Sequence, residues 1–76
     1  MKFDNLTHDK IAFVNHLINN LNNENVMKSL THSERLYSYL TQLQSYLTEK
    51  ETFDIFTNTD DCILTNEEID NLTIIN

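Results

Sequence analysis

The chain has 76 residues, a formal net charge of −7, and neither glycine nor proline. Average usage would give about five glycines and four prolines, and these residues build most hairpin turns and tight loops. Their absence excludes glycine-rich phosphate loops and nucleotide-binding fingerprints, and it disfavours β-sheet architectures. We therefore expect a single all-α domain over residues 1–76, in which asparagine takes any left-handed turn position.

The first predicted helix runs from about Thr7 to Leu21. Apolar residues recur there at spacings of three and four, which is typical of a helix with one buried face. The asparagine-rich segment that follows should end this helix, with Asn22 or Asn23 as the cap. We expect Val26 and Met27 to lie under the next loop. The apolar residues of the predicted buried face are Ile11, Val14, Leu17, Ile18 and Leu21.

The motif Leu-Thr, followed by two residues and a charged residue, begins at four positions: residues 6, 30, 47 and 64. Threonine is a favoured N-cap, because its hydroxyl accepts a hydrogen bond from an unpaired amide at the helix start. A glutamate three residues later completes a capping box by accepting from the amide of the cap. The motif therefore predicts helix starts at Thr7, Thr31 and Thr65. At Thr48 it is ambiguous, because apolar residues continue on both sides.

The central segment, residues 31–56, is predicted to be one helix about 39 Å long. The alternative is that Thr48 starts a separate helix. The last helix should begin at Thr65 and offer Ile69, Leu72 and Ile75 to the core. The expected architecture is thus a small bundle of three helices with a long central one, and the alternative is four helices in two helix–loop–helix units. The predicted apolar face of the central helix comprises Leu36, Tyr39, Leu40, Leu43, Tyr46, Leu47, Phe53 and Phe56.

The four-helix alternative rests on a local resemblance. Residues 53–69 resemble an EF-hand, with Thr57, Thr59 and Asp61 at the first three ligand positions and Glu68 at the twelfth. However, Thr57 stands where aspartate is required, and Cys62 stands where glycine makes the sharp turn. A fainter echo covers residues 23–34. The resemblance implies a degenerate helix–loop–helix without calcium, and the capping boxes explain the same threonines and glutamates more simply.

The acidic residues are concentrated in the second half of the chain. Residues 49–70 contain eight carboxylates against Lys50 alone, which accounts for the whole net charge, and the remainder of the chain is balanced. Such a concentrated negative field suits docking to a basic partner, although helix-dipole support and solubility explain part of it. Five lysines and arginines are too few for direct nucleic-acid binding. The candidate partner-binding residues are Glu49, Asp54, Asp60, Asp61, Glu67, Glu68 and Asp70.

No catalytic residue, metal site or cofactor is expected. His8, His16 and His32 are too scattered for a metal centre, and no histidine is spaced to activate a serine. Cys62 is the single cysteine, which excludes an internal disulfide and favours a reducing compartment. Neither a secretion signal nor a membrane-spanning stretch is expected, so the sequence predicts a cytoplasmic protein.

These features favour a small acidic, non-enzymatic regulator or inhibitor that binds a basic surface of a partner protein. A nucleic-acid-binding partner is one such target, because an acidic protein can imitate nucleic acid. Phages and mobile elements use compact acidic inhibitors of this kind, including DNA mimics and anti-CRISPR proteins, and size and charge alone suggest that class here. The alternative function is a self-associating helical module, a homodimer formed through the leucines of the central segment: Leu36, Leu40, Leu43 and Leu47. The third is the degenerate EF-hand-like protein.

Overall fold

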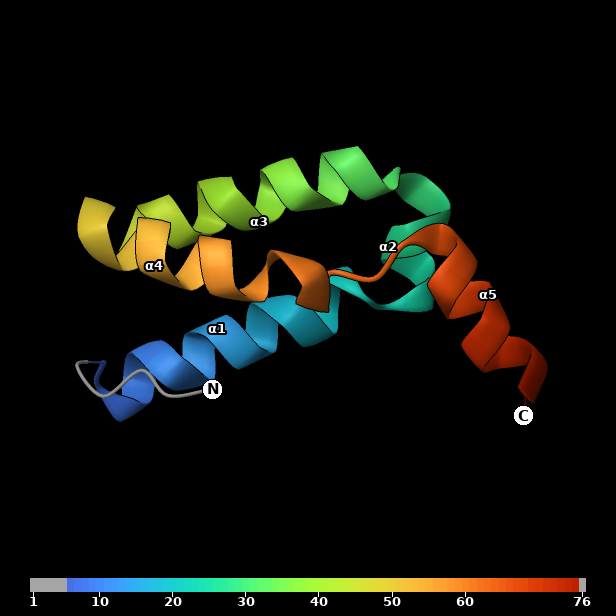
Figure 1. Cartoon of the computed structure of the whole chain (residues 1–76), viewed down its shortest axis with the longest axis horizontal. Helices are drawn as coiled ribbons and strands as arrows, with labels where there is room; N and C mark the ends of the chain where they lie inside the picture. The colour runs from blue at the N-terminus through green and yellow to red at the C-terminus, as the bar shows by residue number, and fades with distance from the viewer. Residues whose placement is uncertain (1–5, 76) are drawn as a thin grey trace.

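The computed structural model describes residues 6–75, with the backbone alone for residues 72–75. The part of the chain described contains helices and no strand, which confirms the all-α prediction. Three helices, α1, α3 and α4, lie side by side with alternating directions, and α5 extends away from them (Figure 1). The elements are α1 (His8–Leu21), α2 (Glu24–Ser29), α3 (His32–Tyr46), α4 (Glu49–Thr59), the 3₁₀ turn η1 (Asp60–Cys62) and α5 (Asn66–Ile75).

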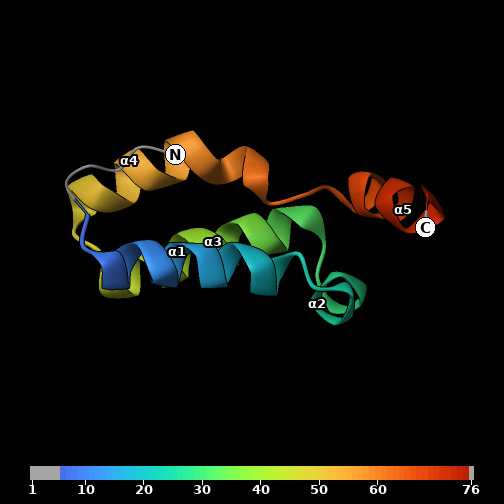
Figure 2. The ribbon, with the colours of Figure 1, turned by 90° about the horizontal axis from the view of Figure 1, so that it is seen from below.

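The molecule is elongated, with principal dimensions of 38 × 22 × 18 Å. Helix α3 packs against both α1 and α4, so it is the central element. The end of α1, the short helix α2 and the start of α3 lie at one end of the molecule, where α5 projects beyond the packed helices (Figure 2). The turn between α3 and α4 lies at the other end (Figure 1).

The Leu-Thr motif builds the helix starts. The hydroxyl of Thr7 accepts the amide of Lys10 at the start of α1, as predicted. At Thr31, Thr48 and Thr65 both bonds of the capping box are present, with donor–acceptor distances of 2.8 to 3.2 Å. The motif also ends helices, because Leu30 and Leu47 are the C-caps of α2 and α3 and have extended backbones. One dipeptide thus stops one helix and starts the next.

The prediction that asparagine supplies left-handed turns is wrong for the described residues. No residue in that part of the chain has a positive φ. Asn22 is the C-cap of α1, as expected, but its φ is −92°. Its amide nitrogen bonds back to Ile18 and Asn20, so the helix ends without a left-handed residue. The chain changes direction through extended residues instead.

The prediction of one continuous helix over residues 31–56 is also wrong. The helix stops at Tyr46, and Leu47 adopts φ −99° and ψ 158° before Thr48 caps α4. Folding back lets α4 pack along α3 and brings Ile55 into the core. A straight helix of about 39 Å would leave its second half without a packing partner. The structure therefore has the alternative, a separate helix that begins after Thr48.

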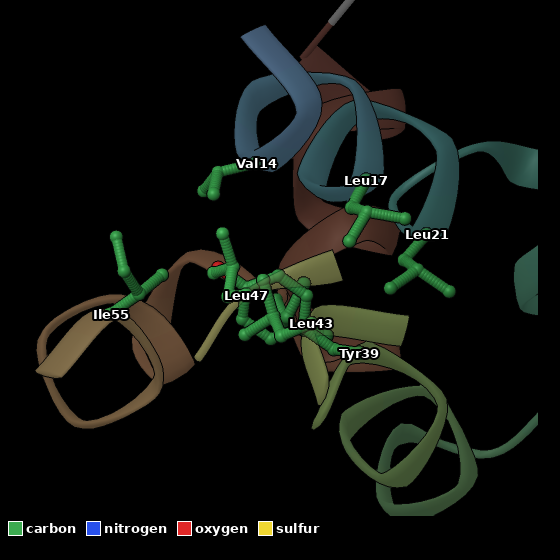
Figure 3. Close-up of a cluster of buried hydrophobic side chains, with 8 residues drawn as sticks. Val14, Leu17, Leu21, Tyr39, Leu43, Leu47 and Ile55 are labelled. Carbon is green, nitrogen blue, oxygen red and sulfur yellow. The ribbon is translucent and has the colours of Figure 1, made fainter. Parts of the chain in front are cut away.

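The core lies between α1, α3 and α4 (Figure 3). The reversal at Leu47 changes which face of residues 49–59 is buried. Ile55 is 1% exposed, whereas Phe53, assigned to the apolar face from the sequence, is 68% exposed. Tyr46 is also exposed, and its ring contacts Phe13 at a centroid distance of 4.8 Å. The buried apolar residues are Val14, Leu17, Leu21, Tyr39, Leu43, Leu47, Ile55 and Ile63.

Two further expectations are not met. Val26 and Met27 do not lie under a loop but belong to the short helix α2, which has no predicted counterpart. The EF-hand-like arrangement is not confirmed, because Thr57 and Thr59 lie within α4 and not in a loop. The Thr57 hydroxyl donates to the backbone carbonyl of Phe53, and Glu68 accepts the amide of Thr65. These oxygens therefore cap and support helices.

The capping boxes predict a pH dependence of stability. The amide of Thr31 donates to the Glu34 carboxylate, and this bond lowers the pKa of Glu34 from its ordinary value of 4.5. A carboxyl group with a lowered folded-state pKa stabilises the fold above its unfolded pKa, and this contribution is lost as the pH falls through the folded pKa. Glu34→Gln should therefore lower the melting temperature near neutral pH, and the difference from the parent should shrink below about pH 4.5.

Thermal unfolding followed by circular dichroism between about pH 7 and about pH 3 measures this difference. Glu67→Gln is the matched control, since it removes one carboxylate from the first turn of a helix without removing a cap bond. Equal and parallel pH curves for the two variants would show that the cap carboxylate contributes nothing specific.

Candidate functional site

A buried arginine joins three helices at the α5 end of the molecule. Arg35, in the first turn of α3, is 0% exposed. Its Nη1 donates to the carbonyl of Leu21 at the end of α1 (3.3 Å), and its Nη2 donates to the Asn66 side chain at the start of α5 (2.5 Å). A cation at the carboxyl end of a helix opposes the negative end of the helix dipole. Arg35 thus ties α1 and α5 to α3.

The same guanidinium has no carboxylate partner among the described residues. Neither ion pair in that part of the chain involves Arg35, and its Nε is buried without a hydrogen bond. Burial lowers the pKa of Arg35, although an arginine stays charged in proteins. The buried charge of Arg35 is therefore held by two neutral oxygen atoms, the carbonyl of Leu21 and the side-chain oxygen of Asn66.

Two side chains fix the segment between η1 and α5. The Asn22 amide donates to the carbonyl of Cys62 (2.9 Å), and its oxygen accepts the amide of Leu64 (3.0 Å). The Nε2 of His32 donates to the carbonyl of Ile63 (3.0 Å). These bonds satisfy backbone groups of residues 62–64 and set the direction in which α5 leaves the packed helices. They also place η1 beside the start of α5.

This arrangement brings three of the predicted partner-binding residues together. Asp60 and Asp61 of η1 and Glu68 of α5 line one surface depression of about 300 Å³, together with His32 and Leu36. The amide of Thr65 donates to Glu68 and lowers the pKa of its carboxyl group, with a smaller contribution from nearby His32. Glu68 therefore stays charged while capping α5.

The other predicted residues are exposed but lie in different places. Glu67 and Asp70 lie on the first turns of α5, one residue before and two residues after Glu68. Asp54 lies in the middle of α4, and Glu49 lies in its first turn. Along α4, Glu49 and Asp60 are about 16 Å apart. The residues of η1 and α5 alone form the acidic end: Asp60, Asp61, Glu67, Glu68 and Asp70.

No lysine or arginine in the described part of the chain forms an ion pair with a residue of the acidic end. Lys10 pairs with Glu51 at 2.9 Å, and Lys28 pairs with Glu24 at 3.5 Å. Arg35 is buried, and Lys50 lies in the first turn of α4. Neither of the ion pairs in the described part of the chain includes a carboxylate of the acidic end. The acidic end therefore presents its negative charge to solvent.

A second hollow lies at the far end of α4. This α3–α4 groove has a volume of about 810 Å³, and Phe53 on its rim is 68% exposed. The sequence analysis missed the groove, because it forms only when the chain reverses at Leu47. The sequence pattern gives no signal for the groove, because it assigns Phe53 to the buried face. The groove is lined by Leu40, Gln44, Leu47, Glu49, Lys50, Thr52 and Phe53.

Neither a metal site nor a reactive thiol is indicated among the described residues. Within residues 6–75 no group of three or more histidine, cysteine or acidic residues is arranged to hold a metal ion. Burial, followed by Asp61 and Asp60, raises the pKa of the Cys62 thiol, so a thiolate is disfavoured at neutral pH. No helix in the described part of the chain is both long and apolar enough to cross a membrane.

Comparison with protein-family models, curated proteins and solved structures finds no match to this chain.

The junction around Arg35 predicts that Asn66→Asp stabilises the protein. A carboxylate in place of the Asn66 amide would give the buried guanidinium a charged acceptor at the same position. The Asn66 oxygen already accepts from a charged donor, and a carboxylate would add the attraction of an ion pair at a partly exposed position, so the free energy of unfolding should rise by about 1 kcal/mol at neutral pH. Urea unfolding measures this change, and the gain should disappear in acid, where the new carboxylate is protonated.

Asn25→Asp is the matched control, because it adds the same charge to the first turn of α2, away from Arg35. The helix dipole alone should give the control a few tenths of a kcal/mol. An equal gain in both variants would mean that Arg35 does not interact with the residue at position 66.

Two buried threonines predict opposite effects of the same substitution. Thr52 Oγ1 is buried without a hydrogen-bond partner, whereas Thr59 Oγ1 donates to the carbonyl of Ile55 and bonds the hydroxyl of Tyr39, each at 2.6 Å. Replacing an unpaired buried hydroxyl by a methyl group removes a desolvation penalty. Thr52→Val should therefore raise the free energy of unfolding by about 1 kcal/mol, and Thr59→Val should lower it by a similar amount. Urea unfolding of both variants tests this, and changes of the same sign would contradict it.

Proposed function

We propose that this protein is a non-enzymatic regulator that binds a basic surface of a partner protein through its acidic end. One observation carries the proposal: Asp60, Asp61 and Glu68 converge on one depression whose lining contains no lysine or arginine, and the exposed Lys28 of α2, at the same end of the molecule, is paired with Glu24. A solubilising charge needs no such convergence, and an evenly mixed surface would serve it.

The proposed mechanism is occlusion. The negative field of the acidic end steers a basic partner towards it and orients the encounter. The half-buried Leu36 in the depression supplies apolar contact area. Once bound, the protein covers the basic surface and prevents its other use. A surface that normally holds nucleic acid is the expected target, because its lysines and arginines match carboxylates as they match phosphates.

The charge and the single cysteine of the protein favour a protein partner in a reducing compartment. Direct binding of nucleic acid is disfavoured, since phosphate contacts require clustered cations and the acidic end has none in the described structure. The single thiol suits a reducing compartment such as the cytoplasm. The alternative function, self-association, is favoured by a different part of the molecule, the α3–α4 groove.

The test is salt-dependent capture with charge reversal. The immobilised protein should retain a basic protein at about 50 mM salt and release it at about 500 mM, because the screening length falls from about 14 Å to about 4 Å. The double variant Asp60→Lys with Glu67→Lys should reduce the affinity for the captured protein, once purified, by at least about tenfold. Calorimetry or biolayer interferometry measures that affinity.

The matched control is Asp9→Lys with Asp54→Lys, which changes the net charge equally on exposed residues of α1 and α4 outside the acidic end. If both double variants bind equally weakly, only the overall charge matters and the acidic end is not the binding site. If neither variant differs from the parent, the electrostatic mechanism is wrong.

A further inference from the structure

The α3–α4 groove lies at the opposite end of α4 from the acidic end and has a different character. Its floor is apolar, with Leu40 from α3 and Leu47 from the turn. Phe53 stands on the rim and is 68% exposed. A phenylalanine this exposed beside a hollow is typical of an anchor residue at a protein interface, where an aromatic ring fills a pocket of the partner.

The charges of the groove indicate what occupies it. Lys50 is the one cation among residues 49–70, and it lines the groove next to Glu49. Both residues are exposed, and neither takes part in an ion pair within the described part of the chain. Lys50 would repel a basic partner at this rim, and Glu49 would repel an acidic partner. A second copy of the chain avoids both conflicts.

A two-fold axis makes such a surface self-complementary. In an interface of this kind residue i of one copy contacts residue j of the other, and j contacts i. Glu49 of each copy can therefore face Lys50 of the other, which gives two equivalent pairs from one acid and one base. The neighbouring Phe53 side chains can each enter the groove of the opposite copy, over Leu40.

We propose that the α3–α4 groove is an interface between two copies of this chain, with Phe53 as the anchor and reciprocal Glu49–Lys50 pairs that set the two-fold register. The groove is the centre of this interface, which must also cover the surface around it. A stable interface takes about 800 Å² from each partner, which is about 15% of the 5438 Å² surface of this chain. Tyr37, 72% exposed on the same side of α3 as Leu40, extends the apolar surface beyond the groove.

The test is sedimentation equilibrium of the full chain over a wide concentration range. The parent should form a dimer, and Phe53→Asp should raise the dissociation constant by at least about 30-fold, the effect of losing a central anchor. Ala12→Asp, on the exposed side of α1, is the control and should leave the constant unchanged. Circular dichroism verifies that every variant keeps its helices.

Charge reversal tests the register. Glu49→Lys alone and Lys50→Glu alone each place like charges opposite one another, and each should raise the dissociation constant by about tenfold. The combined variant restores opposite charges across the axis and should return the constant to within about threefold of the parent. This restoration is specific to a reciprocal pair, because it leaves the net charge of the parent unchanged.

The outcomes are decisive in each direction. A chain that stays monomeric up to about 1 mM overturns the proposal, since an affinity weaker than this is no specific interface. A dimer that tolerates Phe53→Asp overturns the location, and a combined charge variant without restoration overturns the two-fold pairing. Saturable binding of a basic helical peptide at Phe53 of a monomer would assign the groove to another protein instead.

This inference and the proposed function can fail separately. The double reversal Asp60→Lys with Glu67→Lys changes only the acidic end and should leave the dimer intact. Phe53→Asp changes only the groove and should leave the salt-dependent capture of a basic partner intact.

Discussion

The structure depends on how a chain without glycine or proline changes direction. With no glycine, left-handed residues are costly, and the described backbone contains none. The chain turns instead through an extended leucine followed by a threonine cap, as at Leu30–Thr31 and Leu47–Thr48. The N–H of the leucine still donates to the carbonyl four residues earlier, and the side chain can be buried, as at Leu47, which is 6% exposed in the core. Each turn thus supplies a helix stop, a core side chain and a helix start.

Arg35 has a comparable role at the other end. It leaves a buried guanidinium without a carboxylate, an arrangement that is destabilising compared with a packed apolar residue of similar volume. In return it bonds the carbonyl end of α1 and the first residue of α5, so the direction of α5 is fixed from within α3. Because the acidic end is formed by η1 and α5, its shape depends on this buried charge. Asn22 and His32 hold the connecting backbone in the same way.

Local rules predicted the fold where a single helix start decides the structure. Thr7, Thr31 and Thr65 cap helices as their sequence context indicates. Thr48 could not be decided locally, because the same capping box can lie within a helix or begin one. The contacts that decide it are distant in sequence: the Lys10–Glu51 pair and the packing of Ile55. Helix α2, with six residues, is too short for an apolar period to be visible.

The candidate sites show the same division. Composition alone identified the acidic residues, but their grouping requires the fold, which unites η1 with α5 and leaves Glu49 and Asp54 elsewhere. The sequence does not predict the groove. A continuous helix would place Phe53 in the core, whereas the turn at Leu47 places the Phe53 side chain on the surface. A periodic pattern cannot reveal a change of phase that tertiary contacts impose.

The separation of the two surfaces along α4 has an electrostatic consequence. Two chains of charge −7 repel each other, and a dimer interface beside the acidic end would be opposed by that repulsion. Glu49 and Asp60 are about 16 Å apart along the helix, roughly two screening lengths at physiological ionic strength. The field of the acidic end is therefore largely screened at the groove. A two-fold pair joined there would point both acidic ends outward, and a partner with two basic surfaces would bind the pair more tightly than a single copy. The turn at Leu47 would then supply the dimer interface, and the junction at Arg35 would hold the two surfaces that bind the basic partner.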